Sequence, residues 1–141
     1  MEECELCGII AKEEKPILIK ENEFAIAISA GFVREGHCTV VPKKHKVSIS
    51  EIEPKEYDAL FDLITQTSKA LEAKYDAEKT YLIVIADKVE HLHFQLIPKH
   101  KDLCSMGDYC FLKMHESEGE RHPKKSEQIT LAEDVKKVMG I

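Results

Sequence analysis

Short apolar runs near the start of the chain predict β-strands. Residues 17–20 and 24–28 are two such runs, and the polar residues 21–23 between them favour a β-hairpin. Residues 38–41 form a third apolar run after a loop. Pro42 ends this predicted strand because proline has no N–H to donate to a strand ladder.

A longer periodic pattern follows and predicts a helix. Apolar side chains recur there at the three- and four-residue spacing of one helix face: Tyr57, Leu60, Phe61, Ile64, Leu71 and Tyr75. Pro54 suits the first turn of a helix, where a backbone N–H has no intrahelical partner. We therefore predict a helix over residues 54–75 with this face packed on a sheet.

Two further apolar runs predict a second hairpin. Residues 80–86 and 91–97 are separated by the polar residues 87–90, and Pro98 closes the second strand. The pattern is weak beyond this point, and only residues 109–113 resemble a strand.

The two ends of the chain carry short helical signals. Residues 4–10 favour one short turn of helix. Thr130 and Glu133 have capping-box spacing, which predicts a short final helix that Gly140 ends. Strands grouped around one main helix indicate an α+β domain with an antiparallel sheet covered on one face. At 141 residues, we expect a single domain over residues 1–141.

Composition narrows the function classes. The chain carries 26 acidic against 20 basic side chains, a formal net charge of −6, which argues against binding extended nucleic acid. The longest apolar run, residues 81–86, is far too short to span a membrane. The acidic start lacks the order of a signal peptide, and the five cysteines are an odd number. We therefore expect a cytoplasmic, reducing environment in which thiols bind metal or stay free.

An alternating segment brings two histidines and a glutamine onto one strand face. His91, His93 and Gln95 are spaced two apart, while Leu92 and Phe94 between them face the core. Three polar side chains at this spacing can line a small anionic group or a metal. The alternative is a solvated polar face on an antiparallel strand, which needs no function.

A second group of residues has metal-ligand spacing. Cys4 and Cys7 form a Cys-x-x-Cys pair, which needs two more ligands to complete a tetrahedral zinc site. His45 and His91 are the natural candidates. Two buried thiols or a redox pair are the alternatives.

Three segments together resemble the histidine triad (HIT) superfamily of nucleotide hydrolases and transferases. They are residues 4–10 (CELCGII), 36–45 (GHCTVVPKKH) and 91–98 (HLHFQLIP), in the family's order. The resemblance covers residues 4–100, and residues 101–141 form a C-terminal extension that adds nothing to it. It implies an antiparallel sheet with one long helix and a short C-terminal helix, assembled as a homodimer.

The resemblance also implies a mechanism and a cofactor. His93 lies where the family's nucleophile forms a covalent nucleotidyl-histidine with the α-phosphorus of a nucleotide, and Gln95 and His37 would contact phosphate oxygens. Similar zinc-bearing members imply a structural zinc ion. Its four ligands would be Cys4, Cys7, His45 and His91.

Departures from the family pattern bear on the substrate. Gln95 replaces a histidine, as in the galactose-1-phosphate uridylyltransferase and dinucleoside-polyphosphate phosphorylase branches, and glutamine cannot protonate a leaving group. Ser29 stands where the family has a ribose-binding aspartate, and the connection over residues 87–90 is shorter than the family's phosphate loop. Leu6 and Ile10 are candidates for a base pocket, with plain core packing as the alternative.

These residues favour an enzyme that acts on a small nucleotide substrate through His93. The acceptor of the nucleotidyl group is water, phosphate or a sugar phosphate. The alternative is a non-catalytic, zinc-stabilised nucleotide-binding module that has lost the phosphate loop.

Overall fold

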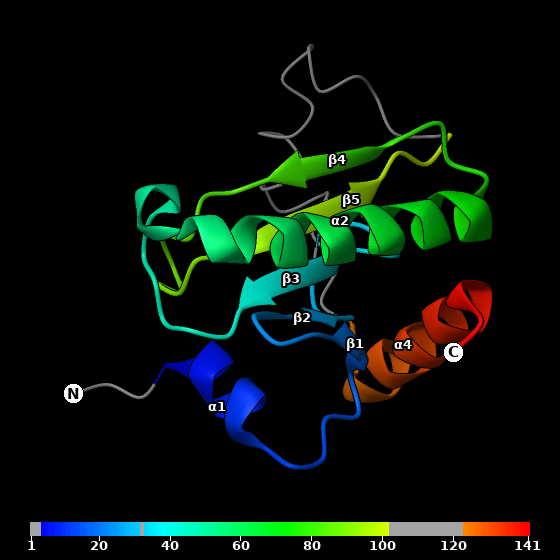
Figure 1. The fold of residues 1–141 in the computed structure, drawn as a ribbon. Helices are drawn as coiled ribbons and strands as arrows, with labels where there is room; N and C mark the ends of the chain where they lie inside the picture. The colour runs from blue at the N-terminus through cyan, green and yellow to red at the C-terminus, as the bar shows by residue number, and fades with distance from the viewer. Residues whose placement is uncertain (1–3, 32, 102–122) are drawn as a thin grey trace.

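The computed structural model describes residues 4–31, 33–101 and 123–141. The long helix α2 lies across one face of a five-stranded sheet, and the short helix α1 lies near strands β1 and β2 (Figure 1). In chain order the elements are α1 (Glu5–Ala11), β1 (Leu18–Glu21), β2 (Ala25–Ile28), β3 (Cys38–Pro42), the 3₁₀ turn η1 (Ile49–Glu51), α2 (Pro54–Tyr75), β4 (Thr80–Ile83), β5 (Phe94–Pro98) and α4 (Lys125–Met139).

The sheet has the strand order β1-β2-β3-β5-β4, and every neighbouring pair is antiparallel. The predicted antiparallel α+β fold is therefore confirmed. β3 and β5 lie side by side in the middle of the sheet, where Thr39 pairs with Gln95. The two motif-bearing segments of the sequence thus meet on neighbouring central strands.

The first hairpin forms where the polar triplet predicted it. The Asn22 side-chain oxygen accepts hydrogen bonds from the backbone N–H groups of Phe24 and Ala25, both at 3.0 Å, which closes the turn. Its amide nitrogen donates to the carbonyl of Ala59 at 2.8 Å. One side chain therefore makes the turn and fastens it to α2.

Helix α2 begins and ends at the predicted residues, but its buried face differs from the prediction. The buried side chains are Glu56, Leu60, Leu63, Ile64, Thr67, Ala70 and Leu71. Tyr57 and Phe61 are 52% and 55% exposed, because on an ideal helix they lie about 80° and about 120° around the axis from the centre of this buried face. The prediction that these two aromatic residues pack on the sheet is wrong.

The strand predicted over residues 91–97 begins later, at Phe94. The backbone N–H of Leu92 donates to the carbonyl of Lys46 at 2.6 Å, so this residue pairs with the loop after β3 and not with the sheet ladder. Leu92, Phe94 and Leu96 nevertheless pack in the core under α2, as the alternation predicts.

The strand predicted over residues 80–86 ends at Ile83. Ala86 adopts a left-handed backbone conformation with φ 57°, which cannot continue an extended strand. The chain therefore turns away from the sheet edge before the polar connection to β5.

The C-terminal helix begins before the predicted capping box. α4 begins at Lys125, so Thr130 lies inside the helix and the predicted start is wrong. Ala132 and Val135 fix this helix by packing into the same core as α2. Gly140 ends it with φ 80°, as predicted. The strand predicted over residues 109–113 lies outside the described residues.

Among the described helices, none is long and apolar enough to cross a membrane.

Candidate functional site

The two cysteines and two histidines predicted as metal ligands lie together. The ligand atoms of Cys4, Cys7, His45 and His91 are all within 4.8 Å of one another. His91 Nδ1 lies 3.4 Å from each of the two sulfur atoms, and His45 Nδ1 lies 3.4 Å from Cys7 Sγ. Sulfur and nitrogen ligands on one tetrahedral zinc ion are about 3.6 Å apart. The cluster therefore has the size of a zinc site.

Backbone geometry and a hydrogen bond orient these ligands. Cys4 is the N-cap of α1, and its sulfur accepts from the backbone N–H of Cys7 at 3.5 Å, which places both thiols on one turn. His91 Nε2 donates to the carbonyl of Pro42 at 2.8 Å. Because a carbonyl only accepts, the proton of a neutral His91 ring is on Nε2, and the Nδ1 lone pair faces the thiols.

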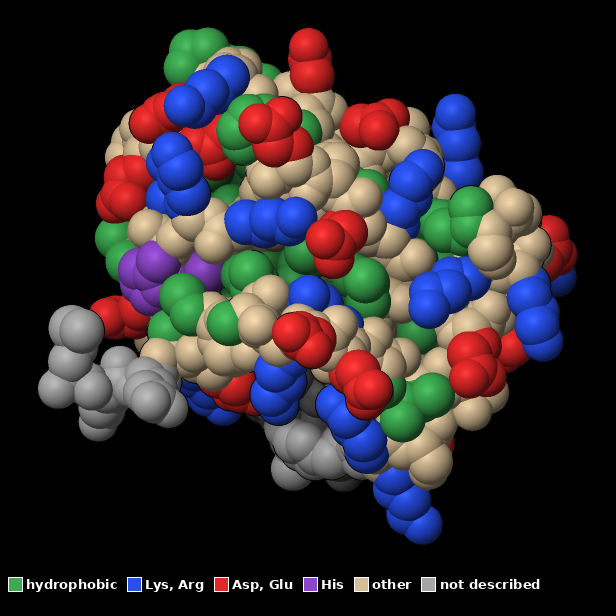
Figure 2. All heavy atoms as spheres, turned by 60° about the horizontal axis from the view of Figure 1, so that its bottom comes forward, with side chains coloured by type: hydrophobic (Ala, Val, Ile, Leu, Met, Phe, Trp, Pro, Cys, Tyr) green, Lys and Arg blue, Asp and Glu red, His purple; other side chains and the backbone are tan. Residues whose placement is uncertain are grey.

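The protonation of His91 suits metal binding, whereas that of Cys7 opposes it. Burial lowers the pKa of His91, and the nearby rings of His45 and His93 lower it further, which keeps the imidazole neutral as a ligand must be. Burial and the neighbouring Cys4 thiol raise the pKa of Cys7. A bound cation would reverse that effect by stabilising the thiolate. Figure 2 shows histidine side chains in one patch of the surface, and interspersed acidic and basic side chains elsewhere on that face.

The backbone of His91 fixes the tautomer of His93, the predicted nucleophile. Its Nδ1 donates to the backbone carbonyl of His91 at 2.7 Å. The ring proton is therefore on Nδ1, and the Nε2 lone pair is available to attack. The side chain is half-buried, so it is reachable by a ligand.

Gln95 and His37 continue from His93 along the sheet. Gln95 pairs with Thr39, and both lie on the face opposite α2, because their strand neighbours pack in the core under that helix. His93 precedes Gln95 by two residues, while His37 precedes Thr39 by two on the antiparallel strand. Gln95 therefore stands between the two histidines, about 7 Å along the strands from each. The register thus orders the three predicted catalytic residues as a row, with His93 just before β5 and His37 just before β3.

His37 is buried in a fixed orientation. The backbone N–H of Val33 donates to its Nδ1 at 3.2 Å, so a neutral ring carries its proton on Nε2. Gly31 lies against the ring: a Cβ there would be 2.1 Å from His37 Cγ. No local sequence pattern indicates that a ring lies against Gly31.

The predicted nucleotide-binding residues come from α1 and from the end of β2. Leu6 and Ile10 of α1 pack against the core residues Ile26 and Val41. The Ser29 hydroxyl faces α4, where it lies 2.5 Å from the carbonyl of Gln128 and 3.3 Å from that of Ile17. Ser29 thus fastens β2 to the first turn of α4, and its role toward a ribose stays a prediction.

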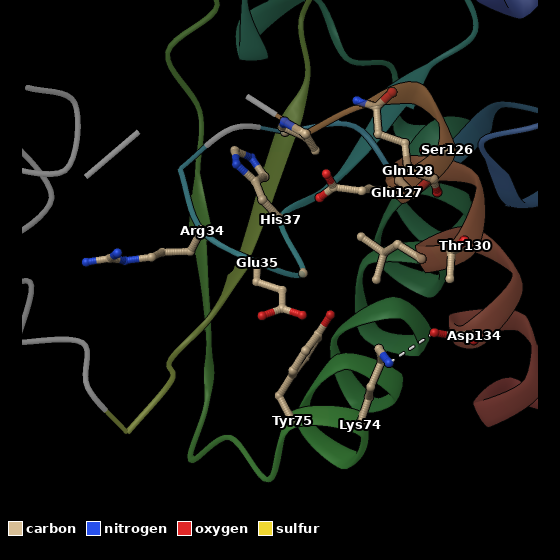
Figure 3. Close-up of a pocket in the computed structure, with 15 residues that line it drawn as sticks. Arg34, Glu35, His37, Lys74, Tyr75, Ser126, Glu127, Gln128, Thr130 and Asp134 are labelled. Atoms are coloured by element: carbon tan, nitrogen blue, oxygen red, sulfur yellow. Dashed lines mark hydrogen bonds and ion pairs between the residues drawn. The ribbon is translucent and has the colours of Figure 1, made fainter. Parts of the chain in front are cut away.

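A cavity of about 320 Å³ opens beside His37 (Figure 3). Its walls are the turn that leads to His37, the end of α2 and the first turns of α4. Charged and polar side chains line it: Arg34, Glu35, Lys74, Tyr75, Glu127, Gln128, Thr130 and Asp134. Lys74 and Asp134 form an ion pair across one wall at 3.3 Å. No motif in the sequence indicates that α4 reaches this site.

A buried ion pair holds the loop that contacts the backbone between His91 and His93. Lys46 Nζ lies 3.1 Å from Glu56 Oε1 and donates to the carbonyl of Glu51 at 2.8 Å, and both charged side chains are buried. The Lys46 carbonyl accepts from Leu92, between the two histidines. In the sequence Lys46 is one of three lysines around His45, and nothing distinguishes it there.

Comparison with known sequences identifies the family signal. The family model described as HIT domain matches residues 11–102. An uncharacterised HIT-like protein of Mycoplasma genitalium is 33% identical over 106 residues, covering 70% of this chain and 74% of that protein. The adenosine 5'-monophosphoramidase of Schizosaccharomyces pombe is 23% identical over 106 residues, covering 74% of this chain and 80% of that protein.

Solved structures share the fold. A hypothetical histidine triad nucleotide-binding protein of Sulfolobus tokodaii superposes with a TM-score of 0.74 at 21% identity, covering 97% of this chain and 92% of that one. A zinc-bound histidine triad family protein of Mycobacterium smegmatis superposes with a TM-score of 0.71 at 19% identity, covering 98% and 94%.

Proposed function

This chain belongs to the histidine triad (HIT) family, and we propose that it is an enzyme that transfers a nucleoside monophosphate through a covalent bond to His93. The hydrogen bond from His93 Nδ1 to the His91 carbonyl carries this proposal. A histidine nucleophile needs one nitrogen fixed as a donor and the other with a free lone pair. The row formed with Gln95 and His37 supplies donors for the phosphate oxygens.

The reaction has two displacements at phosphorus. His93 Nε2 attacks the α-phosphorus, forming a P–N bond, while the P–O bond to the leaving phosphate breaks and that group departs with its electron pair. A water molecule or the oxygen of a phosphate or sugar phosphate then attacks the same phosphorus, and the P–N bond breaks. Water loses a proton to solvent in this step. Gln95 donates and accepts hydrogen bonds but has no proton to give at neutral pH.

The leaving group follows from Gln95. A phosphate departs without a proton, whereas an amine needs one. We therefore favour dinucleoside polyphosphates and nucleotide sugars as substrates over the phosphoramidates that the Schizosaccharomyces pombe relative is named for. A small single domain is similar in size to the hydrolases of the family and favours hydrolysis, whereas Gln95 favours transfer or phosphorolysis.

We also propose that Cys4, Cys7, His45 and His91 hold a structural zinc ion. Four protein ligands leave no open coordination position, so the ion would cross-link the N-terminal segment, the loop after β3 and the start of β5. His91 would then be fixed by the metal on Nδ1 and by Pro42 on Nε2. Its carbonyl, which orients His93, is held as a consequence.

The alternative is a zinc-stabilised nucleotide-binding module without catalysis. The connection between β4 and β5 favours it, because Asp87 and Glu90 are exposed there and two acids disfavour a phosphate. In this reading the His93 row binds a nucleotide without forming a covalent bond.

One experiment separates the two. The protein is incubated with dinucleoside polyphosphate or nucleotide sugar labelled at the α-phosphorus, quenched in alkali and tested for protein-bound label that acid releases. We expect label on the wild type and on the control His100→Gln, and none on His93→Ala, which still binds nucleotide. Binding without label from any nucleotide supports the module and contradicts the enzyme. The rate of label loss with added phosphate or sugar phosphate identifies the acceptor.

A homodimer and a cytoplasmic location complete the proposal. β4 is an edge strand of the sheet, and Leu82 and Ile85 beside that edge are 42% and 47% exposed, as expected for a surface that a second copy covers. Light scattering on the purified protein measures this state directly. The paired thiols of the metal site require a reducing compartment.

A further inference from the structure

Cys4 and Cys7 are placed to bond to each other as well as to a metal. Both are free thiols, and their sulfur atoms lie within 4.8 Å of one another. The Gly8 N–H donates to the Cys4 carbonyl at 3.0 Å, so the two cysteines stand on one helical turn. On such a turn, Cα atoms three residues apart are about 5 Å from each other, within the roughly 4.4–6.8 Å that a disulfide bond spans. Joining the two sulfur atoms therefore requires no movement of a distant segment.

The cluster is accessible to a small reagent. Both cysteines are half-buried, and Cys7 Sγ lies 3.4 Å from Nδ1 of the exposed His45. Cys38, the third cysteine among the described residues, is fully buried, and burial raises its pKa to about 12. An oxidant in solution should therefore react with the Cys4 and Cys7 pair and not with Cys38.

A disulfide bond and a metal compete for the same two sulfur atoms. Zinc binds cysteine as the thiolate, and a sulfur atom in a disulfide bond is no longer a thiolate. After oxidation the cluster would offer only His45 and His91 of its four ligands. A structural zinc site uses four ligands, so two imidazoles would not retain the ion.

We propose that Cys4 and Cys7 form a reversible disulfide bond that releases the metal, with a small disulfide such as oxidised glutathione as the oxidant. One thiolate of the pair attacks a sulfur atom of the small disulfide, so that a mixed disulfide forms and one small thiolate departs. The second protein thiolate then attacks the protein sulfur of the mixed disulfide, so that the Cys4–Cys7 bond forms and the other small thiolate departs. Two electrons pass from the cysteine pair to the oxidant, and the zinc ion leaves unreduced as Zn²⁺.

This disulfide switch rests on the metal site of the proposed function and not on the proposed catalysis. Its effect would nevertheless reach the neighbouring site. Without the ion, the His91 ring keeps the Pro42 carbonyl as a partner at 2.8 Å but has no metal on Nδ1. Oxidation would therefore act on the residue whose backbone carbonyl orients His93.

The test titrates the zinc-loaded protein with mixtures of oxidised and reduced glutathione at two buffered concentrations of free zinc. Alkylation and peptide mass mapping identify the disulfide, and metal analysis of the desalted protein gives the bound zinc. We expect one Cys4–Cys7 disulfide for each zinc ion lost, and recovery of thiols and zinc binding when a dithiol reductant and zinc are added. Because the metal and the disulfide exclude each other, the midpoint depends on free zinc. Tenfold more free zinc should raise the ratio of oxidised glutathione to the square of reduced glutathione at half-oxidation by about tenfold.

A double variant separates this pair from the remaining cysteines. Cys104→Ser/Cys110→Ser removes two thiols that lie outside the described residues and keeps the pair. It should titrate as the wild type does, with the same midpoint and the same dependence on zinc. A midpoint that shifts in this variant, or a disulfide that includes any cysteine other than Cys4 and Cys7, overturns the switch.

The other opposing results are distinct from failure of the proposed function. The switch is wrong if the protein keeps its zinc in oxidised glutathione alone, if only mixed disulfides form, or if the midpoint does not depend on free zinc. If the reduced protein binds no zinc, the proposed metal site fails and the switch fails with it. Failure of the proposed catalysis, seen as the absence of label on His93, leaves this titration unchanged.

Discussion

Replacing Gly31 by alanine tests whether His37 is fixed by the backbone beneath it. The new Cβ would lie 2.1 Å from His37 Cγ and 2.3 Å from Cδ2, whereas ordinary contacts begin near 3.4 Å, so the ring must move by about 1.3 Å. His37 is only 3% exposed and its Nδ1 accepts from the Val33 N–H at 3.2 Å, so a displacement of the ring breaks this hydrogen bond. Overpacking of this kind costs about 1–3 kcal/mol of unfolding free energy.

The catalytic consequence of this substitution should exceed the cost in stability. In the proposed mechanism His37 contacts the phosphate, and a displacement of about 1 Å in such a group can lower the rate of the chemical step by about a hundredfold. Formation of the acid-labile label on His93 in a single turnover measures that rate, and urea unfolding measures the stability.

A matched glycine and a double-mutant cycle control this prediction. A Cβ at Gly8 meets no atom within 4 Å, and Gly8 lies in α1, so Gly8→Ala should stabilise the protein by about 0.5–1 kcal/mol. In a His37→Ala background the clash disappears, and Gly31→Ala should cost much less stability than in the wild type. An equal cost in both backgrounds would refute the steric explanation.

Three further predictions concern the surroundings of the site. Lys46→Met should lower the unfolding free energy, measured in urea, by about 3–5 kcal/mol, because it leaves the Glu56 carboxylate buried without its partner. The control Lys55→Met removes an exposed ion pair and should cost under about 1 kcal/mol. Equal costs would contradict the role of burial. Ala86→Gly should raise the unfolding free energy by up to about 1 kcal/mol, because a φ of 57° is unfavourable for a residue with a side chain. Glycine also gives the unfolded chain more freedom, which offsets only part of this stabilisation. A loss of stability would contradict the prediction. Zinc affinity is measured by competition with a chromophoric chelator and should rise by at least about tenfold from pH 6.5 to pH 7.5. The reason is that the raised pKa of Cys7 keeps that thiol protonated, so zinc must displace the proton. An affinity that does not change with pH would exclude thiolate binding.

The features predicted from the sequence are those that local spacing determines. Helix α2 begins at Pro54 and has the predicted bounds, because a proline in the first turn and an apolar period are both properties of neighbouring residues. The Cys-x-x-Cys pair forms part of a ligand cluster because a capped helical turn brings residues three apart together.

The features missed depend on contacts between distant segments. The late start of β5 follows from the bond between Leu92 and the Lys46 carbonyl, which no pattern near Leu92 indicates. Glu127 reaches the cavity because Ala132 and Val135 pack α4 into the core under α2, and residues 101–141 carry no motif that predicts this. The position of the cavity wall therefore had to come from the tertiary structure.

The spacing of His91 and His93 links the two sites through one backbone unit. The ring of His91 faces the two thiols, and its carbonyl accepts the Nδ1 proton of His93 at 2.7 Å. Any rotation of the His91 ring out of the cluster would also break its bond to Pro42 and release the segment that presents this carbonyl. A metal held by the cluster would then restrain the tautomer of His93, the proposed nucleophile, without touching the substrate. Loss of the metal should therefore slow the formation of the His93 label more than it weakens nucleotide binding. The reverse order would mean that the cluster supports the fold alone.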